Sequence, residues 1–217
     1  MERVRRIVTR SGGGFRGKFP SRKLGCMVHY QSLLERDAIL HFEYHPAVVK
    51  YQEQPSRETY YDAKNNARFY YPDFLAILVS TAEINHEVKP QAKLRSARVR
   101  DKLERVALRM AEEGRTFRVW TEEHIRREPL FTNLRRLHEL RRPSIQATAI
   151  DLLVEAARAE AVSFELGDLA ERFGSEAEVL RLIARGTFQA NLEQAMTPNS
   201  RVWTQWDREN IDGAFSL

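Results

Sequence analysis

Apolar and polar positions in the middle of the chain predict a pair of antiparallel strands. The run from Phe69 to Leu78 is aromatic and aliphatic, and after a short polar turn residues 84–90 alternate in polarity. A period of two places successive side chains on opposite faces of a strand. Glu87 and Lys89 therefore share one face of the predicted hairpin.

The segments on either side of this hairpin predict further strands and helices. Apolar residues that recur every three or four positions indicate helices, and short β-branched or aromatic runs indicate strands. The expected helices are 30–42, 93–113 and 127–142. The expected strands are 48–51, 59–61 and 117–120, with a turn at 62–66. This order predicts an α/β fold in which helices flank a mixed sheet.

The last third of the chain predicts a smaller second domain. Its expected elements are helices 145–161, 166–173 and 176–185 and strands 186–190 and 201–203. Three helices and a hairpin are typical of a winged helix, whose third helix would present Arg181 and Arg185 and whose hairpin would present Arg201. These few cations leave DNA reading and protein docking equally open. The predicted organisation is a basic arm over 1–25, a first domain over 26–142 and a winged-helix-like domain over 143–217.

Composition narrows the class of protein. Apolar residues make up 42% and charged residues 30%, which is a globular balance, and no apolar run is long enough to span a bilayer. The single cysteine, Cys26, excludes an intrachain disulfide framework. The basic start of the chain lacks the apolar core of a secretory signal, so we expect no export and a cytoplasmic location.

The net charge of +5 favours a polyanionic partner, and the cations gather in two places. One is the arm over 1–25, which either follows a DNA backbone or is a solvated, disordered terminus. The other is the exposed face of helix 93–113, which is either a DNA contact or an ordinary solvated surface. The candidate DNA-binding residues are Arg3, Arg5, Arg6, Arg10, Arg16, Lys18, Arg22, Lys23, Arg95 and Arg98, and the helix continues with Arg100, Lys102, Arg105 and Arg109.

Two acidic residues, Asp73 and Glu87, fall side by side in the predicted hairpin. Two carboxylates ~4 Å apart repel each other by roughly 4 kcal/mol at an effective dielectric constant of about 20. A Mg²⁺ ion would relieve that repulsion, since it prefers one or two carboxylates together with waters and phosphate oxygens. Lys89 beside such an ion could orient or deprotonate an attacking water. Pro72-Asp73, a gap and then Glu87-Val88-Lys89 fit the PD-(D/E)XK nuclease signature, although two strands with a few charges also carry it by chance.

Three further polar residues near these strands have alternative interpretations. Ser32 and Glu35 fit a capping box at the start of the first helix, or Glu35 is a third acid delivered beside the hairpin. His86 alternates with Glu87, so we expect it to pack on the opposite face, with a catalytic role as the alternative. Gln54 either supports the site or makes a hydrogen bond at the end of a strand.

Several motifs, taken in order, resemble TnsA, the endonuclease subunit of heteromeric transposases. They are Phe19-Pro20-Ser21-Arg22-Lys23, Ser32-Leu33-Leu34-Glu35-Arg36-Asp37, His45-Pro46-Ala47-Val48-Val49, Gln52-Glu53-Gln54-Pro55, Tyr71-Pro72-Asp73-Phe74, Glu87-Val88-Lys89-Pro90 and Trp120-Thr121-Glu122. The resemblance implies a restriction-endonuclease-like fold that cuts the 5′ ends of a transposon, while a DDE transposase, TnsB, cuts and joins the 3′ ends. It also implies contact between the C-terminal half and an ATPase regulator, TnsC.

The resemblance also assigns roles to residues of the site. Glu35 matches the family's helix acid, Asp73 and Glu87 its strand acids, and Lys89 its lysine, although some members carry glutamine where this chain has Glu87. Asp73, Glu87, the Val88 carbonyl and Glu35 would then hold Mg²⁺, with Mn²⁺ as a substitute. The first hypothesis is a Mg²⁺-dependent endodeoxyribonuclease of a transposon. The alternatives are a restriction or repair nuclease of the same fold, and a non-catalytic DNA-binding or assembly subunit.

Overall fold

The computed structural model describes residues 15–142 and 147–204, which fall into two compact units. Unit 1 takes in residues 15–43 and 48–126 of the described chain, and unit 2 takes in residues 44–47 and those from 127 onward. Within the described ranges, no helix combines the length and the apolar character that crossing a membrane requires.

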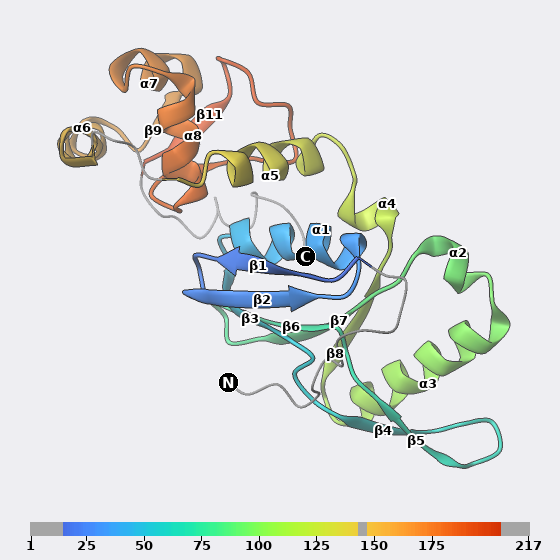
Figure 1. Cartoon of the computed structure of the whole chain (residues 1–217). Helices are drawn as coiled ribbons and strands as arrows, with labels where there is room; N and C mark the ends of the chain where they lie inside the picture. The colour runs from blue at the N-terminus through green and yellow to red at the C-terminus, as the bar shows by residue number, and fades with distance from the viewer. Residues whose placement is uncertain (1–14, 143–146, 205–217) are drawn as a thin grey trace. The chain divides into compact units, whose positions relative to one another are not determined.

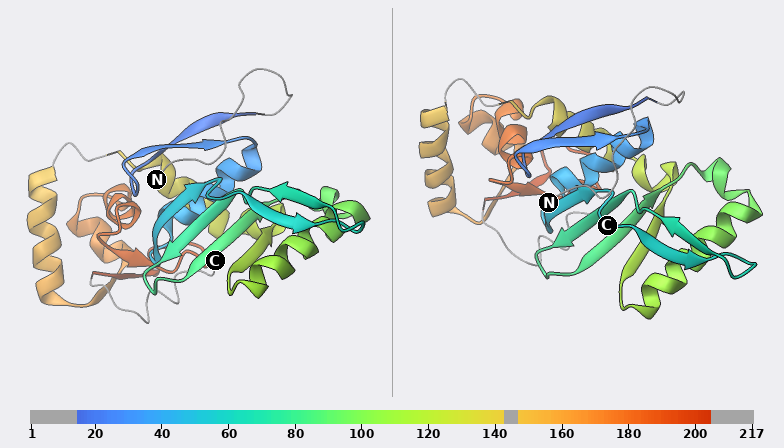
Figure 2. Two further views of the ribbon diagram at one scale, coloured as in Figure 1. Left: turned by 90° about the horizontal axis from the view of Figure 1, so that it is seen from below. Right: turned by 60° about the horizontal axis from the view of Figure 1, so that its bottom comes forward.

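A four-stranded mixed sheet is the centre of unit 1 (Figure 1). Its strands are β3 (Val48–Glu53), β6 (Phe74–Leu78), β7 (Glu83–Val88) and β8 (Thr116–Trp120), in the order β3-β6-β7-β8. The pairs β3/β6 and β6/β7 are antiparallel, whereas β7 and β8 run parallel. The predicted mixed sheet and its central hairpin, β6–β7, are confirmed. Figure 2 shows this sheet from two further directions.

Aromatic side chains hold helix α1 (Leu33–Tyr44) against one face of the sheet. Phe42 stacks on Trp120 with 5.3 Å between ring centroids, and it also contacts Tyr51. His86 lies against the same rings, 5.0 Å from Phe42 and 4.3 Å from Trp120, and it is fully buried. The alternation along β7 therefore places His86 in the core, as the sequence predicted, and leaves Glu87 on the opposite face.

The aromatic run from Phe69 to Leu78 is not one strand. Its first residues belong to β5 (Ala67–Tyr70), which pairs with β4 (Glu58–Tyr61) in a separate two-stranded hairpin. Only the later residues enter β6 of the main sheet. Pro72 lies in the break, where its missing N–H group and fixed φ do not suit a continuing central strand.

The single helix expected over 93–113 is also divided. The structure has α2 (Gln91–Leu94) and α3 (Ala97–Glu112), separated at Ser96. Ser96 has an extended backbone, and its carbonyl accepts the first hydrogen bonds of α3. Serine prefers this capping position to a helix interior, which explains the break. After β8, Thr121 caps the short helix α4 (Glu122–Ile125).

The predicted basic arm over 1–25 is partly structured. Residues from Gly17 onward form a hairpin of β1 (Gly17–Ser21) and β2 (Cys26–Tyr30), whose turn uses Gly25 at a φ of 67°. A positive φ suits glycine because it has no Cβ atom. The arm expected over 1–25 is therefore structured from Gly17 onward, and residues 1–14 lie outside the described residues.

Among its described residues, unit 2 contains four helices and three strands, and the predicted helices and strands appear in the predicted order. The elements of unit 2 are α5 (Leu130–Glu139), α6 (Ala147–Glu160), β9 (Ser163–Glu165), α7 (Leu166–Arg172), α8 (Glu176–Ala184), β10 (Gln189–Ala190) and β11 (Arg201–Trp203). The short strand β9 was not predicted, and it pairs with β11 in a sheet of order β10-β11-β9.

The boundary between the units lies at residue 126, not at 142 as the sequence suggested. The helix predicted over 127–142 was assigned to the end of the first domain, but α5 packs within unit 2. Asn133 donates hydrogen bonds of 2.8 Å to the carbonyls of Leu192 and Gln194, and Arg136 pairs with Glu176 at 3.1 Å. Burial of its apolar stripe against α8 makes α5 part of this unit, since a solvated connector would leave that stripe exposed.

Candidate functional site

The register of β6 and β7 brings Asp73 and Glu87 to the same end of the hairpin. Phe74 pairs with His86, so the preceding Asp73 lies opposite Glu87. The Val88 N–H donates a 2.8 Å hydrogen bond to Asp73 Oδ2, and the Asp73 carbonyl accepts a 2.9 Å bond from the Gln54 N–H. Asp73 is thus fixed through both its side chain and its backbone.

Glu87 is buried, with 2% of its surface exposed, and each of its carboxylate oxygens has a partner. Lys89 Nζ lies 2.5 Å from Oε1, and the Tyr70 hydroxyl donates to Oε2. The Lys89 N–H donates to the Trp120 carbonyl at 2.9 Å, which holds the lysine beside β8. Glu87 and Lys89 therefore share one face, as the sequence predicted. Tyr70 was missed because nothing in its spacing points to Glu87.

Glu35 has both features that the sequence left open. Ser32 Oγ accepts from the Glu35 N–H at 3.1 Å and donates to the Glu35 carboxylate at 3.1 Å, which is capping at the start of α1. The carboxylate also accepts a 2.7 Å bond from the Gln31 N–H. Burial raises the pKa of Glu35 against these hydrogen bonds, and the charges of Lys89 and Glu87 act on it as well. Glu35 thus caps the helix within electrostatic reach of the strand acids.

The carboxylates of Asp73, Glu87 and Glu35 are close to one positive charge, that of Lys89. Desolvation and the charges of Glu87 and Glu35 raise the pKa of Asp73 well above its ordinary value. Burial disfavours the Lys89 ammonium, but the carboxylates of Glu87, Asp73 and Glu35 outweigh it and raise the pKa of Lys89. One lysine therefore sits among three acids, an arrangement typical of functional sites.

The donor set fits a hard divalent cation that is held by few protein ligands. Within the described ranges, no group of three or more His, Cys, Asp and Glu side chains is arranged to hold a metal ion. Mg²⁺ needs fewer, because it commonly takes one or two carboxylates and completes its shell with waters and phosphate oxygens. Asp73 and Glu87 provide that pair, and their mutual repulsion favours a cation between them.

Gln54 makes the strand-end hydrogen bond that the sequence allowed. Its N–H group donates to Asp73, and its backbone adopts a φ of 44°, which is unusual for a residue other than glycine. The side chain is 7% exposed, and its amide oxygen has no hydrogen-bond partner among the described residues. Gln54 therefore fixes the backbone of Asp73.

The basic residues predicted to bind DNA lie in different surroundings. Arg3, Arg5, Arg6 and Arg10 lie outside the described residues. Arg16, Lys18 and Arg22 are exposed on or beside the β1–β2 hairpin. Lys23 differs from them, because its Nζ donates to the Phe42 carbonyl at 2.7 Å. Burial lowers the pKa of Lys23 to about 7, although Glu43 opposes that shift. Lys23 is thus held inside unit 1, and the structure does not support a phosphate contact there.

The cations on and just before α3 differ in whether they form ion pairs. Arg105 pairs with Asp101 at 2.9 Å, and Arg109 pairs with Glu113 at 2.8 Å. Arg95, between α2 and α3, and Arg98, in the first turn of α3, are exposed and have no side-chain ion pair or hydrogen bond to any described residue. Arg100 instead donates to the carbonyls of Leu94 and Arg95, at the end of α2. The cations left unpaired are those nearest Lys89 in the chain.

The fold and the site together define a class of protein. A mixed sheet flanked by helices, with two acids and a lysine on its central hairpin, is a restriction-endonuclease-like fold of the PD-(D/E)XK type. Residues 45–122 match a family model described as "TnsA-like endonuclease N terminal". This match confirms the resemblance seen in the motifs and supports a nuclease of the TnsA-like kind over these residues.

The match covers the strand residues of the site and not its helix acid. Asp73, Glu87, Val88 and Lys89 lie within residues 45–122, whereas Glu35 precedes them. A comparison of the chain with curated proteins gives no match. The role of Glu35 therefore rests on its position in the structure and on the motifs around it.

Proposed function

We propose that the protein is a metal-dependent endodeoxyribonuclease that cuts the 5′ strands at the ends of a Tn7-type transposon, together with a DDE transposase. The observation that carries this proposal is the pair Asp73 and Glu87, held beside Lys89 in a segment that matches a TnsA-like endonuclease. Mg²⁺ is the expected ion, and Mn²⁺ should replace it.

Each residue has a role in phosphodiester hydrolysis. Asp73 and Glu87 would hold Mg²⁺, with the Val88 carbonyl and Glu35 as further candidates. The ion would supply charge neutralisation at the phosphate and lower the pKa of a bound water. The raised pKa of Lys89 favours its cationic form, so we assign it to orienting the attacking water and offsetting phosphate charge, in preference to proton abstraction.

The exposed cations near the site would hold the DNA backbone. Arg95 and Arg98 are free of ion pairs to described residues and follow Lys89 closely in the chain. Lysine and arginine contacts to phosphates position a duplex without reading its sequence. Recognition of the transposon ends would then belong to the partner transposase.

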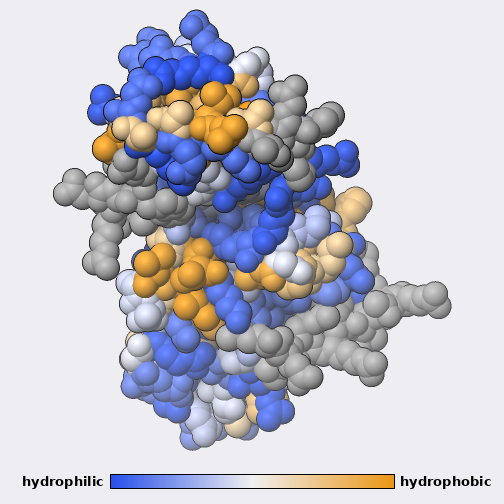
Figure 3. All heavy atoms as spheres, turned by 90° about the vertical axis from the view of Figure 1, so that its left-hand side faces the viewer, coloured by the Kyte–Doolittle hydropathy of each residue, from blue (hydrophilic) through white to orange (hydrophobic). Residues whose placement is uncertain are grey.

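Unit 2 is proposed to be a winged-helix-like domain that docks protein. Helix α8 corresponds to the third helix of such a domain. The apolar residues of α8 are buried, and its Arg181 already pairs with Glu178 on the same helix. Helix α6 instead exposes Leu152 and Leu153, which are 71% and 37% accessible. Figure 3 shows that apolar side chains gather in groups among polar ones on one face of the molecule. An ATPase regulator of the TnsC kind is the proposed partner.

A plasmid-nicking assay tests the nuclease proposal. A supercoiled plasmid carrying the transposon ends is incubated with Mg²⁺ and the full-length chain, with and without the partner transposase, and the cut strands are mapped. With the wild-type protein we expect 5′-strand cuts at the ends in Mg²⁺ or Mn²⁺ and none in Ca²⁺. The Asp73→Ala variant should make no cuts. Full activity in Ca²⁺, or no cleavage with any ion and partner, would refute the proposal. Cleavage that needs neither transposon ends nor transposase would instead indicate a restriction or repair nuclease.

A further inference from the structure

The Tyr70 hydroxyl reaches the site from outside the PD-(D/E)XK signature. Tyr70 is the last residue of β5, in the β4–β5 hairpin, and only 5% of its surface is exposed. Its hydroxyl donates to Glu87 Oε2, while Lys89 occupies the other carboxylate oxygen. Glu87 is thus held between two donors that come from different parts of unit 1.

The ring of Tyr70 is fixed by packing against α3 and β8. It lies in a cluster with Leu103, Val106 and Met110, and Phe117 contacts it edge-on with 6.0 Å between centroids. Lys102 Nζ lies 4.9 Å from the ring centroid, a cation–π contact. A ring held on several sides has little freedom, so the direction of its hydroxyl is set by the fold.

The strand that carries Tyr70 is anchored as well. Tyr70 pairs with Glu58 across the hairpin, and both oxygens of Glu58 accept 2.7 Å bonds from Arg115, just before β8. This bidentate contact ties the hairpin to the strand beside β7. The hydroxyl therefore approaches Glu87 from a rigid layer formed by β4, β5 and α3.

We propose that Tyr70 is a positioning residue that fixes the Glu87 carboxylate beside Asp73 for cation binding. Without the hydroxyl, Oε2 would lose its donor, and the carboxylate could turn toward Lys89 and away from Asp73. The inference rests on the proposed function, because it concerns the cation that Asp73 and Glu87 would hold. Loss of a hydrogen bond to a ligating carboxylate typically weakens metal affinity about 10- to 100-fold.

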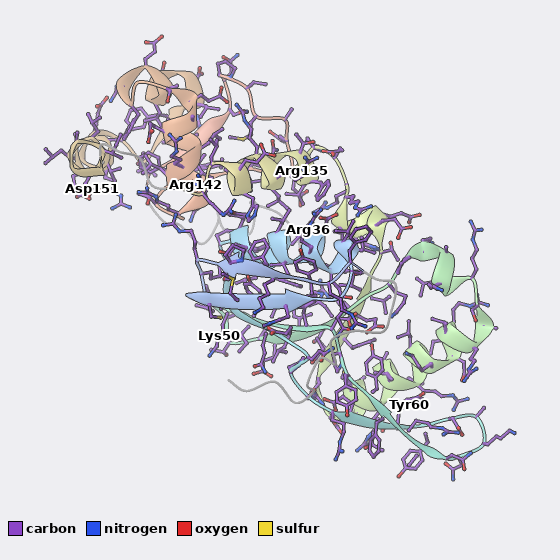
Figure 4. All side chains as sticks on the ribbon, in the orientation of Figure 1. Arg36, Lys50, Tyr60, Arg135, Arg142 and Asp151 are labelled. Atoms are coloured by element: carbon purple, nitrogen blue, oxygen red, sulfur yellow. The ribbon has the colours of Figure 1, made fainter. Side chains whose placement is uncertain are left out.

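The test compares Tyr70→Phe with Tyr60→Phe in the full-length chain. Both changes remove one phenolic oxygen from the same layer, and Tyr60 packs against the same cluster (Figure 4). The Tyr60 hydroxyl has no hydrogen bond to any described residue, so Tyr60→Phe controls for packing. Mn²⁺ binding is measured by electron paramagnetic resonance, without DNA, and the melting temperature is measured in parallel.

We expect the Kd for Mn²⁺ to rise at least about 10-fold in Tyr70→Phe and to stay unchanged in Tyr60→Phe, at similar melting temperatures. Adding Tyr70→Phe to Glu87→Gln should weaken binding no further than Glu87→Gln alone, because the hydroxyl acts through Glu87. An unchanged Kd in Tyr70→Phe, while Asp73→Ala abolishes Mn²⁺ binding, would overturn the positioning role and leave the proposed function standing. No Mn²⁺ binding by the wild-type protein would overturn both.

Discussion

Two carboxylate sites in unit 1, around Glu43 and around Glu87, differ in how well each negative charge is compensated. Glu43, 8% exposed, accepts from the hydroxyls of Ser21 and Tyr51 and from the N–H groups of Arg22 and Lys23. Asp73, Glu87 and Glu35 instead share the single ammonium of Lys89, and the pKa of Asp73 is raised by its surroundings.

The difference separates a structural carboxylate from the candidate functional ones. Donors from β1, the following turn and β3 surround Glu43, so its charge holds the N-terminal hairpin to α1 and the sheet. The acids around Lys89 also accept hydrogen bonds, but they share one ammonium and repel one another. That repulsion costs stability, which a bound cation would return. The exposed fraction alone does not distinguish Glu43 from Glu87, because both side chains are buried.

The largest expected effect is on stability, from Glu43→Ala. The change leaves the buried hydroxyls of Ser21 and Tyr51 without an acceptor, and each unsatisfied group costs about 1–3 kcal/mol. We expect a loss of about 3 kcal/mol or more, and thus a drop in melting temperature of at least ~6 °C. The exposed Glu83, on β7, is the matched control, since Glu83→Ala should change stability by less than ~0.5 kcal/mol. Equal melting temperatures for the two variants would show that the Glu43 network is not structural.

The next effect is on cleavage and separates the two roles of Glu35. Glu35→Ala removes both the acid and its part in the cap, whereas Ser32→Ala removes the capping hydroxyl alone and should cost about 1 kcal/mol of stability. If Glu35 belongs to the site, its loss should slow nicking about 10- to 100-fold, while Ser32→Ala nicks at the wild-type rate. Nicking rates on the same plasmid, with melting curves, measure both. If Glu35→Ala and Ser32→Ala have the same nicking rate and the same melting temperature, Glu35 acts only as a helix cap.

Much of the fold follows from local patterns in the sequence. Period-two alternation correctly predicts β6 and β7, and from it the shared face of Glu87 and Lys89 and the buried position of His86. The same pattern misses the break at Pro72, because it registers β-branched and aromatic character without the hydrogen-bond partner of each strand. It also misses β9, whose three residues are too short to show a period.

The site is less predictable where it depends on tertiary contacts. Asp73, Glu87 and Lys89 are found from their motif, because two adjacent strands bring them together. Tyr70 reaches Glu87 only after the hairpin folds onto α3, so no spacing in the chain predicts the contact. The inward position of Lys23 is hidden for the same reason, because a basic run gives no sign that one lysine donates to the Phe42 carbonyl.

A smaller effect distinguishes the paired and unpaired cations of α3. Arg95→Ala/Arg98→Ala removes exposed charges without partners, whereas Arg105→Ala/Arg109→Ala removes charges already paired with Asp101 and Glu113. The slope of log K against log salt for duplex binding should fall by up to ~0.9 for each lost phosphate contact in the first pair. It should change little in the second. Equal slopes would mean that α3 does not hold DNA, leaving that role to other basic residues.

The smallest effect is a gain in stability from Asp73→Asn, and its sign depends on pH. Desolvation and the nearby carboxylates raise the pKa of Asp73 above the ordinary 3.8, so between that value and the raised one the folded protein holds a proton that the unfolded chain has lost. Stability therefore falls as pH rises through this window. Asparagine avoids this loss and still accepts from the Val88 N–H, so we expect no advantage below about pH 3.8 and a growing one toward pH 7.

Each kcal/mol of relieved repulsion should raise the melting temperature of Asp73→Asn by ~2–4 °C, measured across pH 4 to 8 without divalent cations. Glu43→Gln is the matched control, because it neutralises a buried carboxylate that already has its donors and should lower stability at pH 7. Adding Mn²⁺ should reverse the order of the wild-type and Asp73→Asn proteins, since only the wild type retains both carboxylates for the cation. If Asp73→Asn melts earlier than the wild type at pH 7 without metal, the acids near Lys89 are structurally compensated, and the contrast with Glu43 disappears.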